Sequence, residues 1–196
     1  MRTMKPARIL LFAMLGAVFA TIGDAFHVRT HTLSYPNPHL FNQAWWVYPG
    51  FLLVFLLMGY LYSLGIGRLF IGMQARQSAS RGSAREMIEA AAAFIFVYLL
   101  SGYGNYDPAF MSVIFYSAFA VRWLLTYDRA WLLLIAAAMA VGGMLAEGAM
   151  SALGLVAYRH VDVFNVPLWL GGLYLHGAFA LREGMRFFVY GSRGQG

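Results

Sequence analysis

The sequence contains no cysteine and few charged residues of either sign. Asp, Glu, Lys and Arg make up 11% of its 196 residues, whereas an average soluble domain has about 25%. Without cysteine there is no disulfide, no thiolate metal site and no cysteine nucleophile. A soluble domain of this length needs a polar shell, and the chain has too few polar side chains to build one. No repeat with a period of about 20–50 residues is visible, which excludes solenoid arrays.

What the chain has in abundance is hydrophobic residues, which make up 61% of the total. A helix that crosses the hydrocarbon of a membrane needs roughly 20 mostly apolar residues, and six stretches come near that length. We therefore predict an all-α polytopic membrane protein, with residues 1–196 forming a single six-helix transmembrane domain. The predicted helices are residues 9–26, 45–66, 87–102, 109–127, 130–158 and 166–181.

The first apolar stretch has two interpretations. Three basic residues precede the run 9–22, and small residues follow it, as in a cleaved secretory signal peptide. Alternatively, the stretch is a retained first membrane helix. We expect retention, because the apolar run continues beyond Asp24 and no soluble domain that could be exported follows it.

The basic residues predict the orientation of the six helices. Cytoplasmic segments of membrane proteins are enriched in Lys and Arg. If the N-terminus is cytoplasmic, 12 of the 14 basic residues lie inside, and only Arg29 and Arg159 lie outside. The sequence thus predicts that both termini are cytoplasmic. This distribution accounts for the net charge of +6 without a nucleic-acid partner. The inside residues are Arg2, Lys5, Arg8, Arg68, Arg76, Arg81, Arg85, Arg122, Arg129, Arg182, Arg186 and Arg193.

Ionisable residues inside membrane helices are costly and generally face a bundle interior or a cavity. Glu147 is the deepest of them, midway along the fifth predicted helix and surrounded by small residues such as Gly143. It is either a polar anchor for a ligand or a partner in an interhelical hydrogen bond. His176 lies midway along the sixth predicted helix. It either packs in the bundle or joins Glu147 at a ligand site.

The remaining candidate groups are at the predicted interfaces. Trp45 and Trp46 follow Gln43 at the start of the second predicted helix, where tryptophan commonly anchors a helix in the headgroup region. His27 and His31 make one H-x-x-x-H pattern. A membrane di-iron enzyme would need several such patterns, so we expect no metal site and no other cofactor. No arrangement of nucleophile, base and acid stands out, so we expect no catalytic activity.

Several of these segments together resemble the Insig family of endoplasmic-reticulum sterol-response proteins. Residues 43–49 (QAWWVYP) are similar to the A-W-W-V-P-P of the family, and residues 124–129 (LLTYDR) are similar to its W-W-T-F-D-R. Leu124 and Leu125 depart from the paired tryptophan of that second motif. The segment 166–170 (VPLWL) and the six-helix layout with both termini cytosolic add to the likeness. The absence of cysteine is a further departure from the family. The short chain suggests a bacterial Insig-like relative, which we expect to lie in the plasma membrane.

The resemblance implies a lipid-binding function. Insig proteins hold an oxysterol between helices in the membrane, so a relative in a bacterium is expected to hold a two-chain lipid such as diacylglycerol, as a sensor or scaffold. The lipid-binding residues expected are Gln43, Trp45, Trp46, Gly143, Glu147 and His176. Asp128 aligns with the partner-binding aspartate of the family. The eukaryotic partners, Scap and HMG-CoA reductase, are not expected in a bacterium, whereas a homo-oligomer is compatible with the small-residue helix faces.

Two other classes of function stay open. A small proton-coupled transporter would need several intramembrane charges and paired repeats, and the sequence offers one deep acid without a repeat. An integral membrane enzyme acting on lipid would need acid, histidine and arginine side chains at one interface. Asp24, His27, Arg29 and His31 are the cluster that could serve it.

Overall fold

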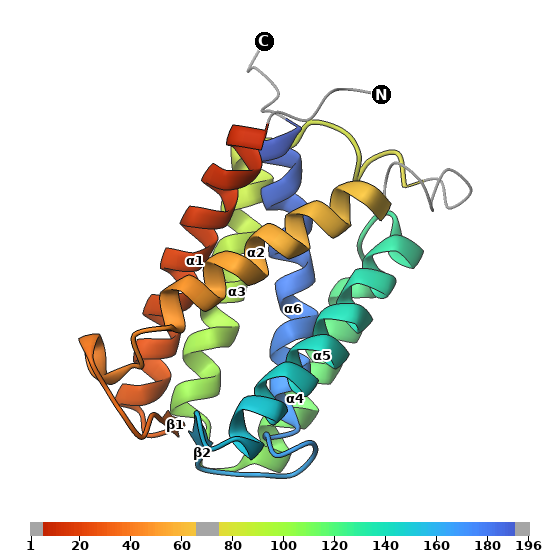
Figure 1. The fold of residues 1–196 in the computed structure, drawn as a ribbon. Coiled ribbons are helices and arrows are strands. Elements are labelled where there is room, and N and C mark those ends of the chain that lie inside the picture. The colour runs from red at the N-terminus through yellow and green to blue at the C-terminus, as the bar shows by residue number, and fades with distance from the viewer. Residues whose placement is uncertain (1–5, 66–74, 191–196) are drawn as a thin grey trace.

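The computed structural model describes residues 6–65 and 75–190, and within them the chain forms six α-helices (Figure 1). The all-α fold class is confirmed. Two antiparallel two-residue strands, β1 (Leu33–Ser34) and β2 (Ala157–Tyr158), join the connections at one end of the bundle. A short π-helical segment, η4 (Met185–Val189), continues the last helix, and a 3-10 turn, η1 (Leu40–Asn42), precedes the second. The helices are α1 (Pro6–Arg29), α2 (Val47–Leu64), α3 (Ala84–Tyr103), α4 (Pro108–Leu124), α5 (Arg129–Ala152) and α6 (Trp169–Gly184).

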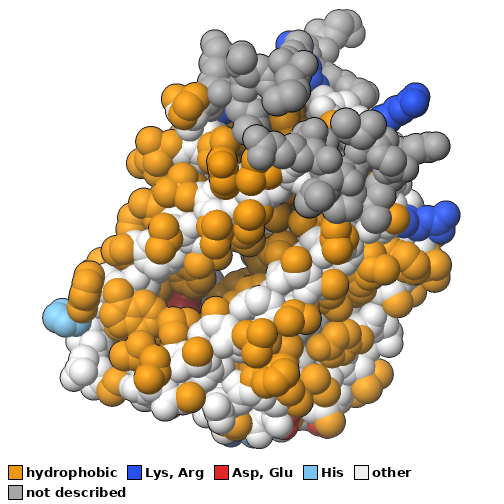
Figure 2. Space-filling model, turned by 45° about the vertical axis from the view of Figure 1, so that its right-hand side comes forward, with side chains coloured by type: hydrophobic (Ala, Val, Ile, Leu, Met, Phe, Trp, Pro, Cys, Tyr) orange, Lys and Arg blue, Asp and Glu red, His pale blue; other side chains and the backbone are white. Residues whose placement is uncertain are grey.

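The outer surface of the bundle is apolar. Figure 2 shows hydrophobic side chains covering most of one face, and the exposed large hydrophobic residues are spread over α1 to α5. Helices α1, α2, α3 and α5 are long and apolar enough to cross a membrane. Helix α4 is apolar but has 17 residues, and α6 has 16. The chain is therefore an integral membrane protein, and within residues 6–65 and 75–190 four helices are long and apolar enough to span a membrane. A count of six crossings stays a prediction.

Helix α6 forms the centre of the bundle. It is buried around its whole circumference, as is expected of a helix enclosed by other helices. Helices α3, α4 and α5 pack around it, and α2 packs chiefly against α1. Glycines allow this close packing: a Cβ atom added to Gly172 would lie 2.6 Å from the Cβ of Phe115 on α4. The polar side chains of the helix therefore point into the protein and not toward lipid.

Capping side chains set the beginnings of α3 and α4. The Ser83 hydroxyl accepts a hydrogen bond from the Glu86 backbone N–H, and the Glu86 carboxylate accepts one from the Ser83 N–H. This reciprocal pair is a capping box. Asp107 caps α4 by accepting from the Phe110 N–H, and Pro108 occupies the first turn, where no N–H is needed.

The connection between α5 and α6 differs from the prediction. The apolar pattern runs on to residue 158, but α5 ends at Ala152 because Gly154 has a φ of +70° and turns the chain. Residues 157–158 then pair with Leu33 and Ser34. A short apolar strand and the last turn of an apolar helix look alike in sequence. Helix α6 begins at Trp169, because Pro167 lies just before it.

The start of α1 and the end of η4 lie at the same end of the bundle (Figure 1). Both ends of the described chain are thus on one side, which is the geometry that an even number of crossings requires. Which side faces the cytoplasm stays a prediction. Four of the basic residues used for that prediction lie outside the described residues, namely Arg2, Lys5, Arg68 and Arg193.

The packing around α6 predicts that alanine lowers the thermal stability at one glycine, Gly172, but not at another, Gly142. Gly172→Ala forces a Cβ into Phe115, and overpacking of this kind costs about 1–3 kcal/mol, so the thermal unfolding midpoint in detergent should fall. Gly142→Ala on α5 is the matched control, because a Cβ there meets nothing within 4 Å. Its midpoint should not fall. Equal midpoints for the two variants would contradict the central position of α6.

Candidate functional site

A hollow opens into the bundle between α2 and α5. Because α2 packs on α1 and α5 packs on α6, these two outer helices do not close against each other. Figure 2 shows the hollow, rimmed by hydrophobic side chains and with an acidic side chain at its edge. Two acidic residues lie in the halves of their helices that are nearer the strands: Asp24 on α1 and Glu147 on α5.

Asp24 is buried and is held by the segment that connects α1 to α2. Its Oδ2 accepts hydrogen bonds from Gln43 Nε2 at 2.7 Å and from the Tyr35 hydroxyl at 2.9 Å. Gln43 also donates to the Thr21 carbonyl oxygen at 2.9 Å. Burial, and after it the Asp24 carboxylate, raises the pKa of the Tyr35 hydroxyl well above its ordinary value. Tyr35 therefore stays a hydrogen-bond donor.

Glu147 is held by α6. The Tyr174 hydroxyl donates to its Oε1, and the Tyr174 ring lies against Gly143, where an added Cβ would be 2.5 Å from Tyr174 Cε2. Glu147, Tyr174 and Tyr98 of α3 all keep partial exposure although they lie well inside the bundle. Tyr35, which binds Asp24, and Ser151, one helical turn from Glu147, line the same cavity. The two acids thus belong to one polar region.

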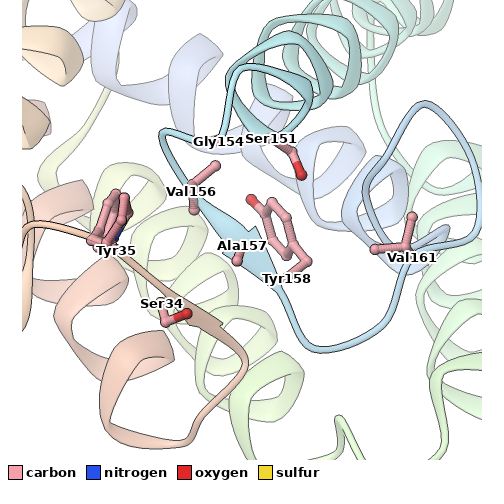
Figure 3. A pocket seen from close by; sticks show the side chains of 9 residues that line it. Ser34, Tyr35, Ser151, Gly154, Val156, Ala157, Tyr158 and Val161 are labelled. Carbon is pink, nitrogen blue, oxygen red and sulfur yellow. The ribbon is translucent and has the colours of Figure 1, made fainter.

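A cavity of about 390 Å³ adjoins this region at the strand-bearing end. Figure 3 shows Tyr35 and Tyr158 from the two connections and Ser151 from α5 around it. Tyr35 joins the cavity to Asp24 through its hydrogen bond. Ser151 follows Glu147 by four residues and so lies on the same face of α5. The lining residues are Ser34, Tyr35, Pro36, Ser151, Gly154, Val156, Ala157, Tyr158 and Val161.

Some of the predicted lipid-binding residues lie at this region. Gln43, Gly143 and Glu147 are part of it through the contacts described above. Trp46 packs its ring edge-on against Tyr35 at a centroid separation of 5.6 Å. Trp45 is 72% exposed and faces outward, as an interfacial anchor would. Whether any of these residues touches a lipid stays a prediction.

His176 lies elsewhere. Its Nδ1 is 2.7 Å from Arg122 Nη1, and its Nε2 is 3.0 Å from the Phe115 carbonyl oxygen. Because a guanidinium can only donate, Nδ1 accepts and the proton is on Nε2, so the ring is neutral. The polar pair that we considered between His176 and Glu147 is not formed. Tyr174 binds Glu147 instead.

Asp128, the predicted partner-binding residue, has a structural role in the described chain. It precedes α5 with a φ of 46°, and its Oδ2 accepts a 2.6 Å hydrogen bond from the Ser78 backbone N–H. This bond fixes the segment 75–83 to the corner between α4 and α5. Asp128 lies at the opposite end of the bundle from the strands, where Figure 1 places the start of α5.

The same end of the bundle carries a buried ionic network that the sequence did not reveal. Glu183 Oε1 accepts from Arg182 Nε at 2.8 Å, and Glu183 Oε2 accepts from Arg186. The Tyr127 hydroxyl donates to Glu183 and accepts from Arg186, and burial raises the pKa of this hydroxyl above its ordinary value. A buried charge is tolerated only with such partners. Arg182 and Arg186 thus stabilise the packing of this end of the bundle, in addition to their part in the prediction of membrane orientation.

Sequence reasoning also missed Asp24, Tyr35 and Tyr174 as parts of the central region. The sequence places Asp24 with His27 in a cluster at the membrane interface. In the structure His27 hydrogen-bonds the Ser101 hydroxyl at 2.7 Å, whereas Asp24 accepts a hydrogen bond from Gln43. The signal in the sequence that could have identified Asp24 as a buried polar group is its position as an acid inside an apolar run. Within residues 6–65 and 75–190, no three His, Asp or Glu side chains come together as metal ligands.

Comparison with known proteins identifies the fold. No family model matches the sequence, and no curated protein matches it. Among solved structures, a crystal structure of MvINS, a mycobacterial Insig homologue from Mycobacterium vanbaalenii, matches with a TM-score of 0.73. The match covers 93% of this chain and 95% of that one, at 22% identity.

The chain has the fold of a mycobacterial Insig homologue. A cross-linked trimer of an arginine-to-cysteine variant of MvINS matches equally well, with a TM-score of 0.73, 21% identity and coverage of 94% of this chain and 96% of that one. The resemblance to Insig proteins predicted from the sequence is confirmed at the level of the fold.

The Asp128 contact predicts a local change in Asp128→Gly. Glycine keeps the positive φ available but removes the acceptor, and a hydrogen bond to a charged group is worth about 1.5–3 kcal/mol. Amide exchange at Ser78 should therefore become at least tenfold faster, as followed by hydrogen–deuterium exchange. Asp128→Asn keeps an acceptor and should show a smaller change, and the amide of Phe110 serves as an internal reference. Unchanged exchange at Ser78 would contradict the anchoring role.

Proposed function

We propose that this protein is a bacterial Insig-like protein of the plasma membrane that binds a neutral lipid such as diacylglycerol between its helices, without catalysis, as a sensor or scaffold. The proposal takes residues 1–196 as one six-helix transmembrane domain with both termini cytoplasmic. The observation that carries it is the polar chemistry inside the bundle: Asp24 accepts hydrogen bonds from Tyr35 and Gln43, Glu147 accepts one from Tyr174, and no Lys or Arg is among the residues that line the adjoining cavity.

This chemistry favours a headgroup with hydroxyl groups and no charge. A phosphate would be repelled by Asp24 and Glu147, because like charges close together are unfavourable in a medium of low dielectric. A free hydroxyl can donate to either carboxylate or to the oxygen of the Tyr35 hydroxyl, whose own proton is donated to Asp24. Such groups in an otherwise apolar cavity are the usual pattern of a ligand site. Diacylglycerol has a hydroxyl of this kind, and so does a sterol.

The size and access of the site also support a lipid. The cavity of about 390 Å³ lies within the range of roughly 300–1,000 Å³ that is common for small-molecule sites. The hollow between α2 and α5 opens on a face covered with hydrophobic side chains (Figure 2). Acyl chains can therefore enter from the membrane. Gln43 would hold Asp24 in position, Trp46 would hold Tyr35, and Gly143 would leave room for Tyr174.

A homo-oligomer is part of this proposal. The support is the cross-linked trimer of MvINS, which has the same fold. Small residues on α5, such as Ala137 and Ala138, are exposed on the outside of the bundle and would permit close helix contacts between subunits. The Asp128 corner would be available to a membrane partner in place of the eukaryotic ones.

Lipid binding is tested with purified protein and dioleoylglycerol. Mass spectrometry of the purified protein should find a co-extracted neutral lipid, and added dioleoylglycerol should raise the thermal unfolding midpoint. At 100 times Kd, a ligand adds about 2.7 kcal/mol to the free energy of unfolding. Glu147→Gln should weaken dioleoylglycerol binding roughly tenfold, which corresponds to about 1.4 kcal/mol.

The control variant is Glu89→Gln, because Glu89 is an exposed acid paired with Arg85 outside the hollow. It should bind dioleoylglycerol as the wild type does. If no lipid is co-purified and dioleoylglycerol does not stabilise the protein, the proposal fails. If Glu147→Gln and Glu89→Gln bind alike, the lipid is not held at the hollow.

A proton-coupled carrier is the second candidate, favoured by two acids on different helices, Asp24 and Glu147, that have hydrogen-bond donors but no basic partner among the described residues. It predicts proton flux in proteoliposomes that Asp24→Asn abolishes, measured with an internal pH dye. The lipid-binding proposal predicts no flux above that of empty liposomes for either protein.

A further inference from the structure

A second cavity, of about 210 Å³, lies at the end of the bundle opposite the strands. It is lined by residues from α3, α4 and α6, and α3 and α4 both pack on α6. A water molecule takes about 30 Å³ in the liquid, so the cavity can hold a group much larger than one water. The lining residues are Glu86, Glu89, Ala90, Arg122, Phe179, Arg182 and Glu183.

Arg122 is the one guanidinium of this cavity that has no carboxylate within ion-pair distance among the described residues. All eight acidic residues of the sequence lie within the described ranges, so none of them is hidden elsewhere. The Arg122 side chain lies over the Phe179 ring, 4.1 Å from its centroid. Its hydrogen bond to His176 orients it but does not neutralise it, because that imidazole is neutral.

The three acids of the cavity are already matched by other arginines. Glu89 pairs with Arg85 at 2.7 Å. Glu183 pairs with Arg182 and Arg186, and Glu86 pairs with Arg186 at 3.3 Å. Four arginines against three glutamates leave one positive charge, and it belongs to Arg122. A cation left without a counter-ion in a partly buried site favours the binding of an anion.

The position of the cavity along the helices indicates which kind of anion it binds. Arg122 lies in the last turn of α4, Arg182 in the last turn of α6, and Glu86 in the first turn of α3. All three are at the ends of helices, where a bilayer places its headgroups. Val121 and Leu124 beside Arg122 are more than half exposed on the apolar outer surface. The positive charge is thus at headgroup level and the hydrophobic surface lies next to it.

We propose that this cavity binds the phosphate group of a membrane phospholipid, with the Arg122 guanidinium as its principal binding group and the Phe179 ring beneath it. His176 is the positioning residue that fixes the guanidinium through its neutral Nδ1. The site is separate from the hollow between α2 and α5 and does not depend on the proposed diacylglycerol function. It selects a phosphorylated headgroup, whereas the carboxyl groups of the hollow disfavour one.

The test is native mass spectrometry of the full chain in nonionic detergent, titrated with dioleoylphosphatidylglycerol. The wild type should retain this lipid, and Arg122→Gln should weaken its binding at least tenfold. Arg122→Lys keeps the charge and should retain part of the affinity, which gives a usable variant if Arg122→Gln unfolds. Arg129→Gln removes an exposed arginine at the same end of the bundle and should bind as the wild type does.

Three results would overturn the proposal. The first is an equal loss of phosphatidylglycerol in Arg129→Gln, which would indicate general attraction to a basic surface. The second is full affinity in Arg122→Gln. The third is inorganic phosphate displacing the lipid at equal concentration, which would assign the site to a soluble anion. Dioleoylglycerol binding measured in Arg122→Gln should be unchanged, so failure of this site and failure of the diacylglycerol site are distinguished.

Discussion

The enclosure of α6 is the constraint on which the rest of the bundle depends. A helix buried on all sides needs neighbours on every face, and its glycines bring α3, α4 and α5 close to it. Three helices around a central one leave the remaining pair, α1 and α2, to pack on each other. Helix α2 is then too far from α5 to close the bundle, and the hollow between them is the result (Figures 1 and 2).

The charged groups inside the bundle that lack an ion-pair partner among the described residues lie at different levels along its length. Toward the strands are Asp24 and Glu147, which have tyrosine and amide donors and no basic partner among the described residues. At the opposite end is Arg122, the arginine of the second cavity that has no carboxylate partner among the described residues. Because desolvation makes each unmatched charge costly, this separation defines two sites that prefer ligands of different charge.

The sequence predicted the elements better than it predicted the contacts. Long apolar runs place all six helices, and the tryptophan pair and residues 124–129 led to the correct fold. The end of α5 was wrong because an apolar strand at 157–158 continues the same hydrophobic pattern. The partner of Glu147 could not be found, because Tyr174 and His176 are both polar residues on one helix, and choosing between them requires the rotation of α6. The sequence did not reveal Glu183 as the buried partner of Arg182 and Arg186. Arginines near a cytoplasmic helix end are already expected from membrane topology, so nothing indicated that these two are buried.

The orientation of α6 about its own axis determines which polar side chain serves each candidate site. Residues two apart on a helix point about 200° away from each other, so Tyr174 and His176 must serve opposite sides of α6. Tyr174 meets Glu147 of α5, and His176 meets Arg122 of α4. Both side chains are fixed to one helix, so any rotation of α6 about its axis would move the two together. Glycines hold α6 in close contact with α4 and α5, which opposes such a rotation. The position of α6 about its own axis therefore assigns one polar side chain to each site, Tyr174 to the hollow and His176 to the second cavity, and the two sites share no binding residue.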